Sequence, residues 1–202
     1  SSRGVSAACS MSPVWEGVLL DGGAGADTLI GGDESTWYVV DNLGDIVIEN
    51  GVPGYLDVLS SSTISLTAVT NVEVLELKGD LALSATGDAG ANDLRGSMNS
   101  AANTLTGLDG DDSYWVGLND VVVEAAGGGV DTVVIDLSAA GAAAQQSNGK
   151  TFSLAHYANV ENLAANGYSG EAPGGANEGV HFVGTAGNNK LLGSFHNDWL
   201  EG

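Results

Sequence analysis

The sequence predicts an all-β protein, a parallel β-solenoid built from short strands and glycine- and aspartate-rich turns. The 202 residues include 31 glycines but only three prolines, and the glycines recur at intervals, which is typical of repeated tight turns. Between the turns, β-branched and acidic residues alternate with the period of two that marks β-strands. The hydrophobic fraction of 43% argues against disorder.

The charge balance restricts the possible partners. Five Lys and Arg stand against 26 Asp and Glu, which gives a net charge of −21. Self-repulsion of this size destabilises a compact chain unless cations lie among the carboxylates. Nucleic acid is excluded as a partner because phosphate contacts require Lys and Arg. No apolar stretch is long enough for membrane insertion, and Cys9, the single cysteine, cannot form an internal disulfide.

Nine-residue units recur in three clusters. The first begins with the letters GGAGADTLI at Gly22. The units span 22–30 and 31–39 in the first cluster, 87–95, the longer 96–106 and 107–115 in the second, and 184–192 and 193–201 in the third. Self-similarity at a fixed short period is the signature of a solenoid.

A longer pattern also repeats between the clusters. The segments Tyr38–Asp41 and Asp45–Glu49 resemble Tyr114–Val116 and Asp120–Glu124. Further matches pair Leu56–Val58 with Val130–Val133, and Asn71–Leu75 with Asn159–Leu163. The chain therefore reads as roughly two copies of one long unit.

These matches define the expected organisation. Residues 1–17 form a non-repeat segment, residues 18–106 a first β-roll unit, and residues 107–202 a second unit that is truncated in mid-repeat. Residues 139–148, rich in Ala, Gln and Ser, predict a loop or short helix inserted into the second copy. Residues 167–179 predict a glycine-rich loop.

The nine-residue pattern Gly-Gly-x-Gly-x-Asp-x-Leu-x suits a metal-binding turn. Its glycines permit positive φ and close packing, so that successive carbonyl oxygens can point inward. Its aspartate supplies the hard anionic oxygen that Ca²⁺ prefers among six to eight ligands. The apolar residue two positions after the aspartate begins the short strand that faces the core.

These units resemble the RTX, or hemolysin-type, calcium-binding repeats. The resemblance implies a right-handed parallel β-roll in which two units make one turn and each Ca²⁺ lies between neighbouring loops on the same side. On this basis, the loop 87–92 should lie beside the loop 107–112 and form the most complete site. The resemblance also implies type I secretion and folding outside the cell when calcium is present.

The expected calcium ligands come from these loops. They are Gly23, Gly25, Asp27, Asp33, Asp88, Gly90, Asn92, Asp109, Gly110, Asp112, Asn189 and Asp198. Only Asp27, Asp112 and Asp198 occupy the signature aspartate position. Thr36 replaces it in one unit, and Asn92, Asn103 and Asn189 in others. Because Asn contributes no charge, we expect weaker sites there and on the order of two to four ions in all.

Other interpretations remain open at this stage. The turns could be metal-free, as in many parallel solenoids. We expect the acidic residues of the long pattern to be solvated strand ends, and not ligands; they are Asp45, Glu49, Asp57, Asp120, Glu124 and Asp131. Trp15, Trp37, Trp115 and Trp199 fit core or strand packing better than a sugar-binding strip.

The pattern favours a non-enzymatic protein. His156, His181 and His196 are too dispersed for a zinc site, and abundant carboxylate pairs alone do not identify a glycosidase. We expect a calcium-folded structural module of a larger secreted or cell-surface protein. The alternative is a module that binds extracellular polysaccharide or copies of itself.

Overall fold

The computed structural model describes most of the repeat region. The described residues are 18–32, 36–50, 54–58, 64–65, 72–117, 119–136, 151–166, 180–194 and 197–202, with the backbone alone described for 54–58 and 64–65. The non-repeat segment 1–17, the insertion 139–148 and the glycine-rich loop 167–179 lie outside the described residues.

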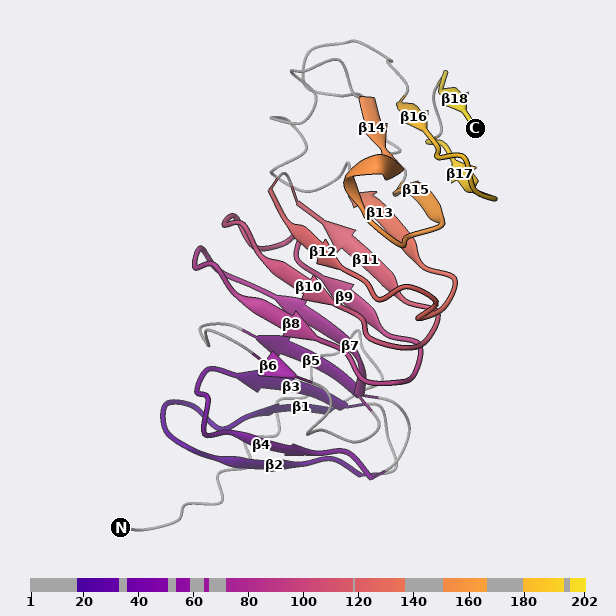
Figure 1. Ribbon diagram of the computed structural model, residues 1–202. Coiled ribbons are helices and arrows are strands. Elements are labelled where there is room, and N and C mark those ends of the chain that lie inside the picture. Colours follow the sequence, from indigo (N-terminus) through magenta and orange to yellow (C-terminus); the bar gives the residue numbers. More distant parts are fainter. Residues whose placement is uncertain are drawn as a thin grey trace.

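The chain forms a parallel β-solenoid, which confirms the predicted fold class (Figure 1). Strands alternate between one large sheet and a series of smaller sheets on the opposite face. The nine-stranded large sheet has the order β1-β3-β5-β7-β9-β11-β13-β15-β17. The small sheets have the orders β2-β4, β12-β10-β8-β6 and β14-β16-β18. Every pairing between these strands is parallel.

The strands are short, as the nine-residue units require. Those of the large sheet are β1 (Val18–Asp21), β3 (Thr36–Val40), β5 (Gly54–Val58), β7 (Val72–Leu77), β9 (Asp93–Arg95), β11 (Ser113–Val116), β13 (Thr132–Asp136), β15 (Asn162–Asn166) and β17 (Lys190–Leu192). Those of the small sheets are β2 (Thr28–Ile30), β4 (Ile46–Ile48), β6 (Ile64–Ser65), β8 (Ser84–Thr86), β10 (Thr104–Thr106), β12 (Val121–Val123), β14 (Thr151–Ser153), β16 (His181–Val183) and β18 (Trp199–Glu201).

Helical structure is minor in the described part of the chain. A single 3₁₀ turn, η3 (Leu154–His156), follows β14. Among the described residues, no helix has the length and apolar character needed to cross a membrane.

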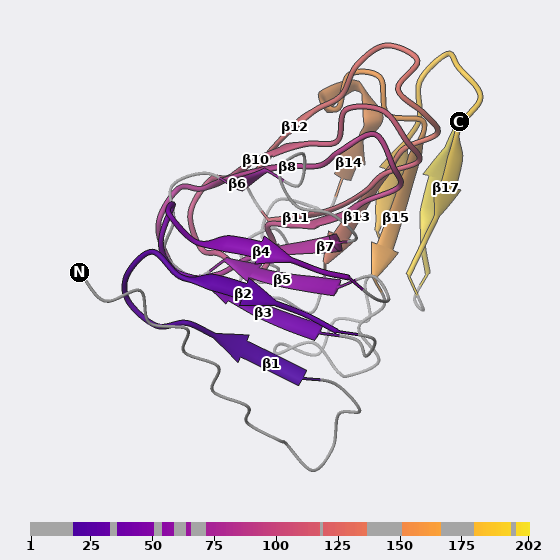
Figure 2. The ribbon, with the colours of Figure 1, turned by 90° about the horizontal axis from the view of Figure 1, so that it is seen from below.

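The core is a stack of inward-pointing side chains at one strand position. In the large sheet, Leu94 pairs with Tyr114 and Tyr114 with Val133, and all three are fully buried. Leu105 and Phe182 of the small sheets are buried on the opposite side of the same core. Seen from below, the large sheet and the small sheets form two faces of one stack of coils (Figure 2). Burial of each such side chain contributes about 1.5–3 kcal/mol.

Strand register corrects one match in the long repeat. Tyr38 pairs with Leu56 in the first copy, and Tyr114 pairs with Val133 in the second. Leu56 therefore corresponds to Val133, whereas the sequence match placed it at Val130. The error arose because the sequences Leu-Asp-Val at 56–58 and Val-Asp-Thr at 130–132 look alike. They are three residues out of register, so that Asp57 lies in a strand and Asp131 in a turn.

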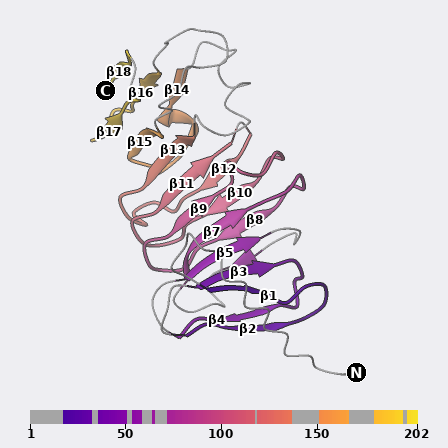
Figure 3. The same ribbon diagram turned by 180° about the vertical axis from the view of Figure 1, so that it is seen from behind.

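The turns form two stacked series, one at each end of the strands of the large sheet. We call the loops that lead into the large sheet the large-sheet entry loops; they include 87–92, 107–112 and 124–131. The loops that lead into the small sheets are the small-sheet entry loops; they include 22–27, 41–45 and the described residues of 117–120 and 193–198. The view from behind shows the strands of the large sheet stacked in chain order, which places successive large-sheet entry loops beside one another (Figure 3).

Candidate metal centre

The large-sheet entry loops are joined by a ladder of backbone-to-carboxylate hydrogen bonds. The backbone N–H of Asn92 donates to Asp112 Oδ1 at 2.7 Å, and that of Asp112 donates to Asp131 Oδ1 at 2.9 Å. The N–H of Asp131 donates in turn to Glu161 Oε2 at 2.9 Å. Each carboxylate thus accepts a hydrogen bond from the preceding coil. The acidic residues therefore hold consecutive coils in register.

The small-sheet entry loops contain the same kind of ladder. The N–H of Asp27 donates to Asp45 Oδ1 at 2.9 Å, and the N–H of Asn103 donates to Asp120 Oδ1 at 2.8 Å. The second oxygens of Asp45 and Asp120 are also satisfied, because Asp45 Oδ2 accepts from the N–H of Asn42 at 3.2 Å and Asp120 Oδ2 from that of Gly117 at 2.7 Å. These two carboxylates serve as turn-stabilising acceptors. Asp27 Oδ2, in the same series of loops, is buried and has no partner.

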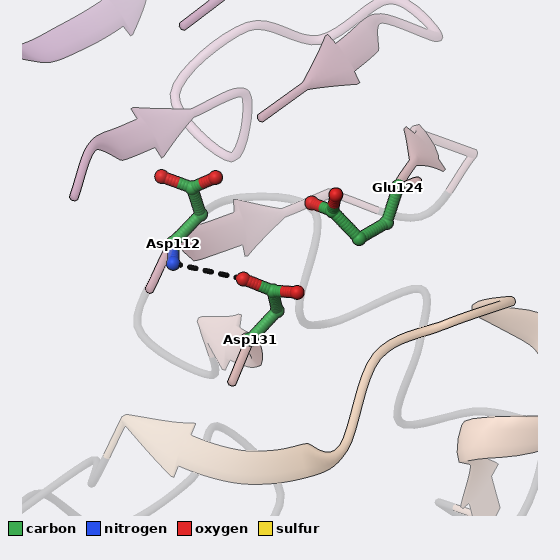
Figure 4. Close-up of side chains that lie close together, drawn as sticks. All are labelled: Asp112, Glu124 and Asp131. Carbon is green, nitrogen blue, oxygen red and sulfur yellow. Dashed lines mark hydrogen bonds between the residues drawn. The ribbon is translucent and has the colours of Figure 1, made fainter. Parts of the chain in front are cut away.

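Asp112 and Asp131 differ in their second oxygen. The Oδ2 atoms of both residues are buried and have no hydrogen-bond partner, although the side chains are only 1% and 0% exposed. Glu124, which is 8% exposed, brings a third carboxylate to the same place. One oxygen from each of the three lies within 4.8 Å of the other two. Figure 4 shows the three side chains converging from two consecutive coils.

Within the part of the chain that the structure describes, no ion pair joins this cluster to a positive charge. Among the described residues, the ion pairs join Lys78 and Arg95 to Glu76 and Asp93, and His181 to Glu201. Burial of an unpaired charge is costly, so a group of this kind is expected to bind a proton or a cation. Three anionic oxygens with no nitrogen or sulfur ligand match the preference of Ca²⁺.

Glycines make room for the cluster. A Cβ atom at Gly107 would collide with Asp112 Oδ2 and would lie 2.8 Å from Glu124 Oε2. A Cβ atom at Gly128 would lie 2.5 Å from the carbonyl oxygen of Leu108 and 2.6 Å from Glu124 Oε1. The Leu108 carbonyl oxygen and Glu124 Oε1 therefore both lie close to Gly128.

Tyr114 fixes Glu124 from the core side. Its hydroxyl donates a hydrogen bond to Glu124 Oε2 in a fully buried environment. Burial and this hydrogen bond to the carboxylate raise the pKa of the Tyr114 hydroxyl, so it stays protonated and acts as a donor.

Burial also raises the pKa of the two aspartates. Loss of solvation, together with the charges of Asp131 and Glu124, raises the pKa of Asp112 to about 7, against the lowering effect of the Asn92 N–H. The same loss of solvation and the charges of Glu124 and Glu161 raise the pKa of Asp131 to about 6. Without a cation, the cluster holds protons that an exposed carboxylate would release.

The raised pKa values predict an unusual pH dependence for the metal-free chain. Between pH 4 and the folded-state pKa, the folded chain binds more protons than the unfolded chain, so its stability falls as the pH rises. For Asp112, the loss from pH 5.5 to pH 8 is about 2 kcal/mol. Urea unfolding in the presence of a chelator, at pH 5.5 and at pH 8, measures this change in the free energy of unfolding. The double variant Asp112→Asn/Asp131→Asn should flatten the dependence, and an unchanged slope in that variant would contradict the assignment.

Several predicted ligands do come together around Asn92. The loop 87–92 lies beside the loop 107–112, as the resemblance implies, because Ser113 N–H donates to the Asn92 carbonyl at 2.8 Å. Gly110, with φ of +117°, packs directly on the carbonyl of Gly90. Asp88, however, is turned toward its own loop, where its Oδ1 accepts from the Gly90 N–H at 2.7 Å.

The other predicted ligands lie elsewhere. Asp27, with Gly23 and Gly25, belongs to the small-sheet entry loops. Asp198 belongs to the same series of loops, in the last coil, and its Oδ1 accepts from Val180 N–H at 2.8 Å. Asn189 uses its Oδ1 to accept from Thr185 N–H at 2.6 Å. Asp109 is exposed to solvent, and Asp33 lies outside the described residues.

Two members of the cluster were not predicted from the sequence. Asp131 and Glu124 were expected to be solvated strand ends, but both are buried, as is Glu49. Asp45 and Asp120 are partly buried and bind backbone N–H groups, and the side chain of Asp57 is outside the description. Solvation was the wrong expectation because the turns of consecutive coils stack on one another and exclude water.

The tryptophans do not form a continuous strip. Trp37 and Trp115 are half-buried on the outer face of the large sheet, next to the inward-pointing Tyr38 and Tyr114. The guanidinium of Arg95 lies 5.1 Å from the ring centroid of Trp115. These two residues therefore pack on strands, which was one of the two expected alternatives, and do not lie in the core. Trp15 lies outside the described residues.

Trp199 belongs to the opposite face of the solenoid. It is 64% exposed on β18 and stacks on His181 with ring centroids 4.6 Å apart.

Comparisons of the chain with models of protein families, with curated proteins and with solved structures gave no match.

Proposed function

We propose that this chain is a calcium-folded structural module of a larger secreted or cell-surface protein, with Asp112, Glu124 and Asp131 as its principal calcium ligands. The observation that carries the proposal is the pair of buried, unpartnered Oδ2 atoms of Asp112 and Asp131 beside the Glu124 carboxylate. The nine-residue repeats and the net charge of −21 support the same conclusion.

The cluster is suited to an ion of the size of Ca²⁺. Ligand oxygens on opposite sides of a bound Ca²⁺ are separated by about twice its 2.3–2.6 Å bond length, and the three carboxylate oxygens lie within 4.8 Å of one another. Carboxylates that bind in bidentate fashion and the Leu108 carbonyl could supply the additional oxygens that Ca²⁺ requires.

Bound calcium would stabilise the fold through charge and through geometry. The carboxylates repel one another without a cation, and the ion removes that repulsion. Asp112 ends one large-sheet entry loop, whereas Glu124 and Asp131 belong to the next one. An ion shared by both loops clamps two consecutive coils, so its binding free energy contributes directly to folding.

Calcium titration with matched variants tests this function. In wild type, calcium at about 1,000 times its Kd should raise the melting temperature by roughly 10 °C, and chelator should reverse the change. Asp131→Asn keeps the acceptor for Asp112 N–H but removes a charged ligand, and should weaken binding by about 100-fold.

Asp109→Asn is the matched control for Asp131→Asn, because it makes the same charge change at an exposed position of the neighbouring loop 107–112. The calcium affinity of Asp109→Asn should differ from that of wild type by less than about threefold. Absence of any heat or melting shift with calcium up to about 10 mM, well above the Kd range of extracellular modules, would refute the function. If Asp131→Asn and Asp109→Asn lose calcium affinity equally, the assignment of the site to these three carboxylates is wrong.

A further inference from the structure

The first copy of the long unit contains the same buried tyrosine–glutamate pair as the second. Tyr38 donates to Glu49 Oε2 at 2.8 Å, as Tyr114 donates to Glu124 Oε2. A glycine packs against each pair: a Cβ atom at Gly31 would collide with the Tyr38 hydroxyl, and one at Gly107 with that of Tyr114. Both glutamates are buried. The two places are therefore structurally equivalent.

The two aspartates are missing from the first copy. Ser113 pairs with Thr132 in the second copy, so Asp112 and Asp131 occupy the preceding positions. Trp37 pairs with Tyr55 in the first copy, so the equivalent positions hold Thr36 and Gly54. Only one carboxylate, that of Glu49, remains of the three.

Hydroxyl groups stand beside Glu49 where the aspartates stand beside Glu124. Thr36 is 1% exposed, and its side chain hydrogen-bonds the Tyr38 hydroxyl, which in turn donates to Glu49. The groups around Glu49 are thus satisfied by hydrogen bonds within the chain. Around Glu124, by contrast, the Oδ2 atoms of Asp112 and Asp131 have no partner. A single buried carboxylate that accepts a hydrogen bond from a hydroxyl depends less on a counter-ion than three adjacent carboxylates do.

We infer that the solenoid is divided in its dependence on cations: the coils of the first copy around Thr36, Tyr38 and Glu49 hold their structure without a cation, and those around Asp112 and Asp131 need one. This inference rests on the proposed function. It implies that removal of calcium opens the chain locally, from β9 to β15, while β2, β3 and β4 stay folded.

Hydrogen exchange of the full chain, with calcium and with excess chelator, measures this division. Amides of residues 93–136 should lose protection by at least about tenfold when calcium is removed, and those of residues 28–48 should change by less than about twofold. Loss of protection in both segments, or in neither while calorimetry still shows calcium binding, would overturn the inference and leave the proposed function intact. Absence of calcium binding would remove the proposed function itself.

Two substitutions at Thr36 test the cause. Thr36→Asp adds a carboxylate beside Glu49 and should lower the calcium-free protection of residues 36–48 by at least about tenfold. Thr36→Val has a similar shape but adds no charge, so its effect should be less than about threefold. Equal effects of Asp and Val would show that the absence of adjacent carboxylates is not what holds the first copy together, and would overturn the inference.

Discussion

Asp112→Asn is expected to raise the stability of the calcium-free chain at pH 8 by about 2 kcal/mol and to weaken calcium binding by at least about 100-fold. An asparagine Oδ1 can still accept the hydrogen bond from Asn92 N–H, and Asn92 and Asn103 already fill equivalent positions in neighbouring loops. The substitution removes one charge from a cluster whose Oδ2 atoms have no partner. The apo protein therefore gains stability while the holo protein loses a ligand.

The same substitution at Asp45 should have the opposite sign. Both carboxylate oxygens of Asp45 accept backbone N–H groups, at 2.9 Å from Asp27 and at 3.2 Å from Asn42. In Asp45→Asn, an amide NH₂ must face a backbone donor, which costs about 1 kcal/mol. Chemical unfolding with and without calcium distinguishes the two variants. If Asp112→Asn destabilises the calcium-free chain as Asp45→Asn does, the Asp112 carboxylate is an ordinary turn acceptor.

Gly129→Ala should destabilise the chain by about 3 kcal/mol or more, with or without calcium. An alanine Cβ at this position would collide with the carbonyl oxygen of Gly110 and would lie 2.5 Å from its carbonyl carbon. The obstacle is backbone of the preceding coil, so no side chain can rotate away. The stacked loops must then separate, which also disturbs the hydrogen bond of 2.8 Å from Val130 N–H to Asp111 Oδ1.

Gly32→Ala is the matched control, because a Cβ atom there meets nothing within 4 Å. It should leave the free energy of unfolding within about 0.5 kcal/mol of wild type. Urea denaturation of both variants in calcium and in chelator measures the difference. A Gly129→Ala chain as stable as Gly32→Ala would mean that the large-sheet entry loops are not in close contact in solution.

The fold could be predicted because each nine-residue unit encodes its own turn and strand. The aspartate-to-apolar spacing placed Leu94 and Tyr114 on the inward face, where both are fully buried. Parallel stacking then follows from short strands whose inward positions recur at the same phase. Local sequence was sufficient because each coil contacts mainly its neighbours.

The candidate site could be predicted only in part. Asp112 stood out because it occupies the signature position of a recognised unit. Asp131 occupies the same position in residues 126–134, AGGGVDTVV, but this unit was not recognised because alanine replaces its first glycine. Its role depends on the register between β11 and β13. Glu124 joins the cluster through Tyr114, across the core side of the turn. A signal did exist in the parallel recurrence of Tyr38 with Glu49 and Tyr114 with Glu124, but its meaning depended on which turns stack.

The carboxylate ladder also gives the solenoid a chemical direction. In the ladder bonds from Asn92 to Asp112 and from Asp27 to Asp45, the acceptor belongs to the later coil and the N–H donor to the earlier one. The bond from Val130 N–H to Asp111 Oδ1 runs the other way and is not part of this ladder. A break between two such coils would leave unlike surfaces, one with N–H donors and one with carboxylates. Two surfaces of the same kind cannot complete this ladder, so any stacking that continues it must join an earlier face to a later one.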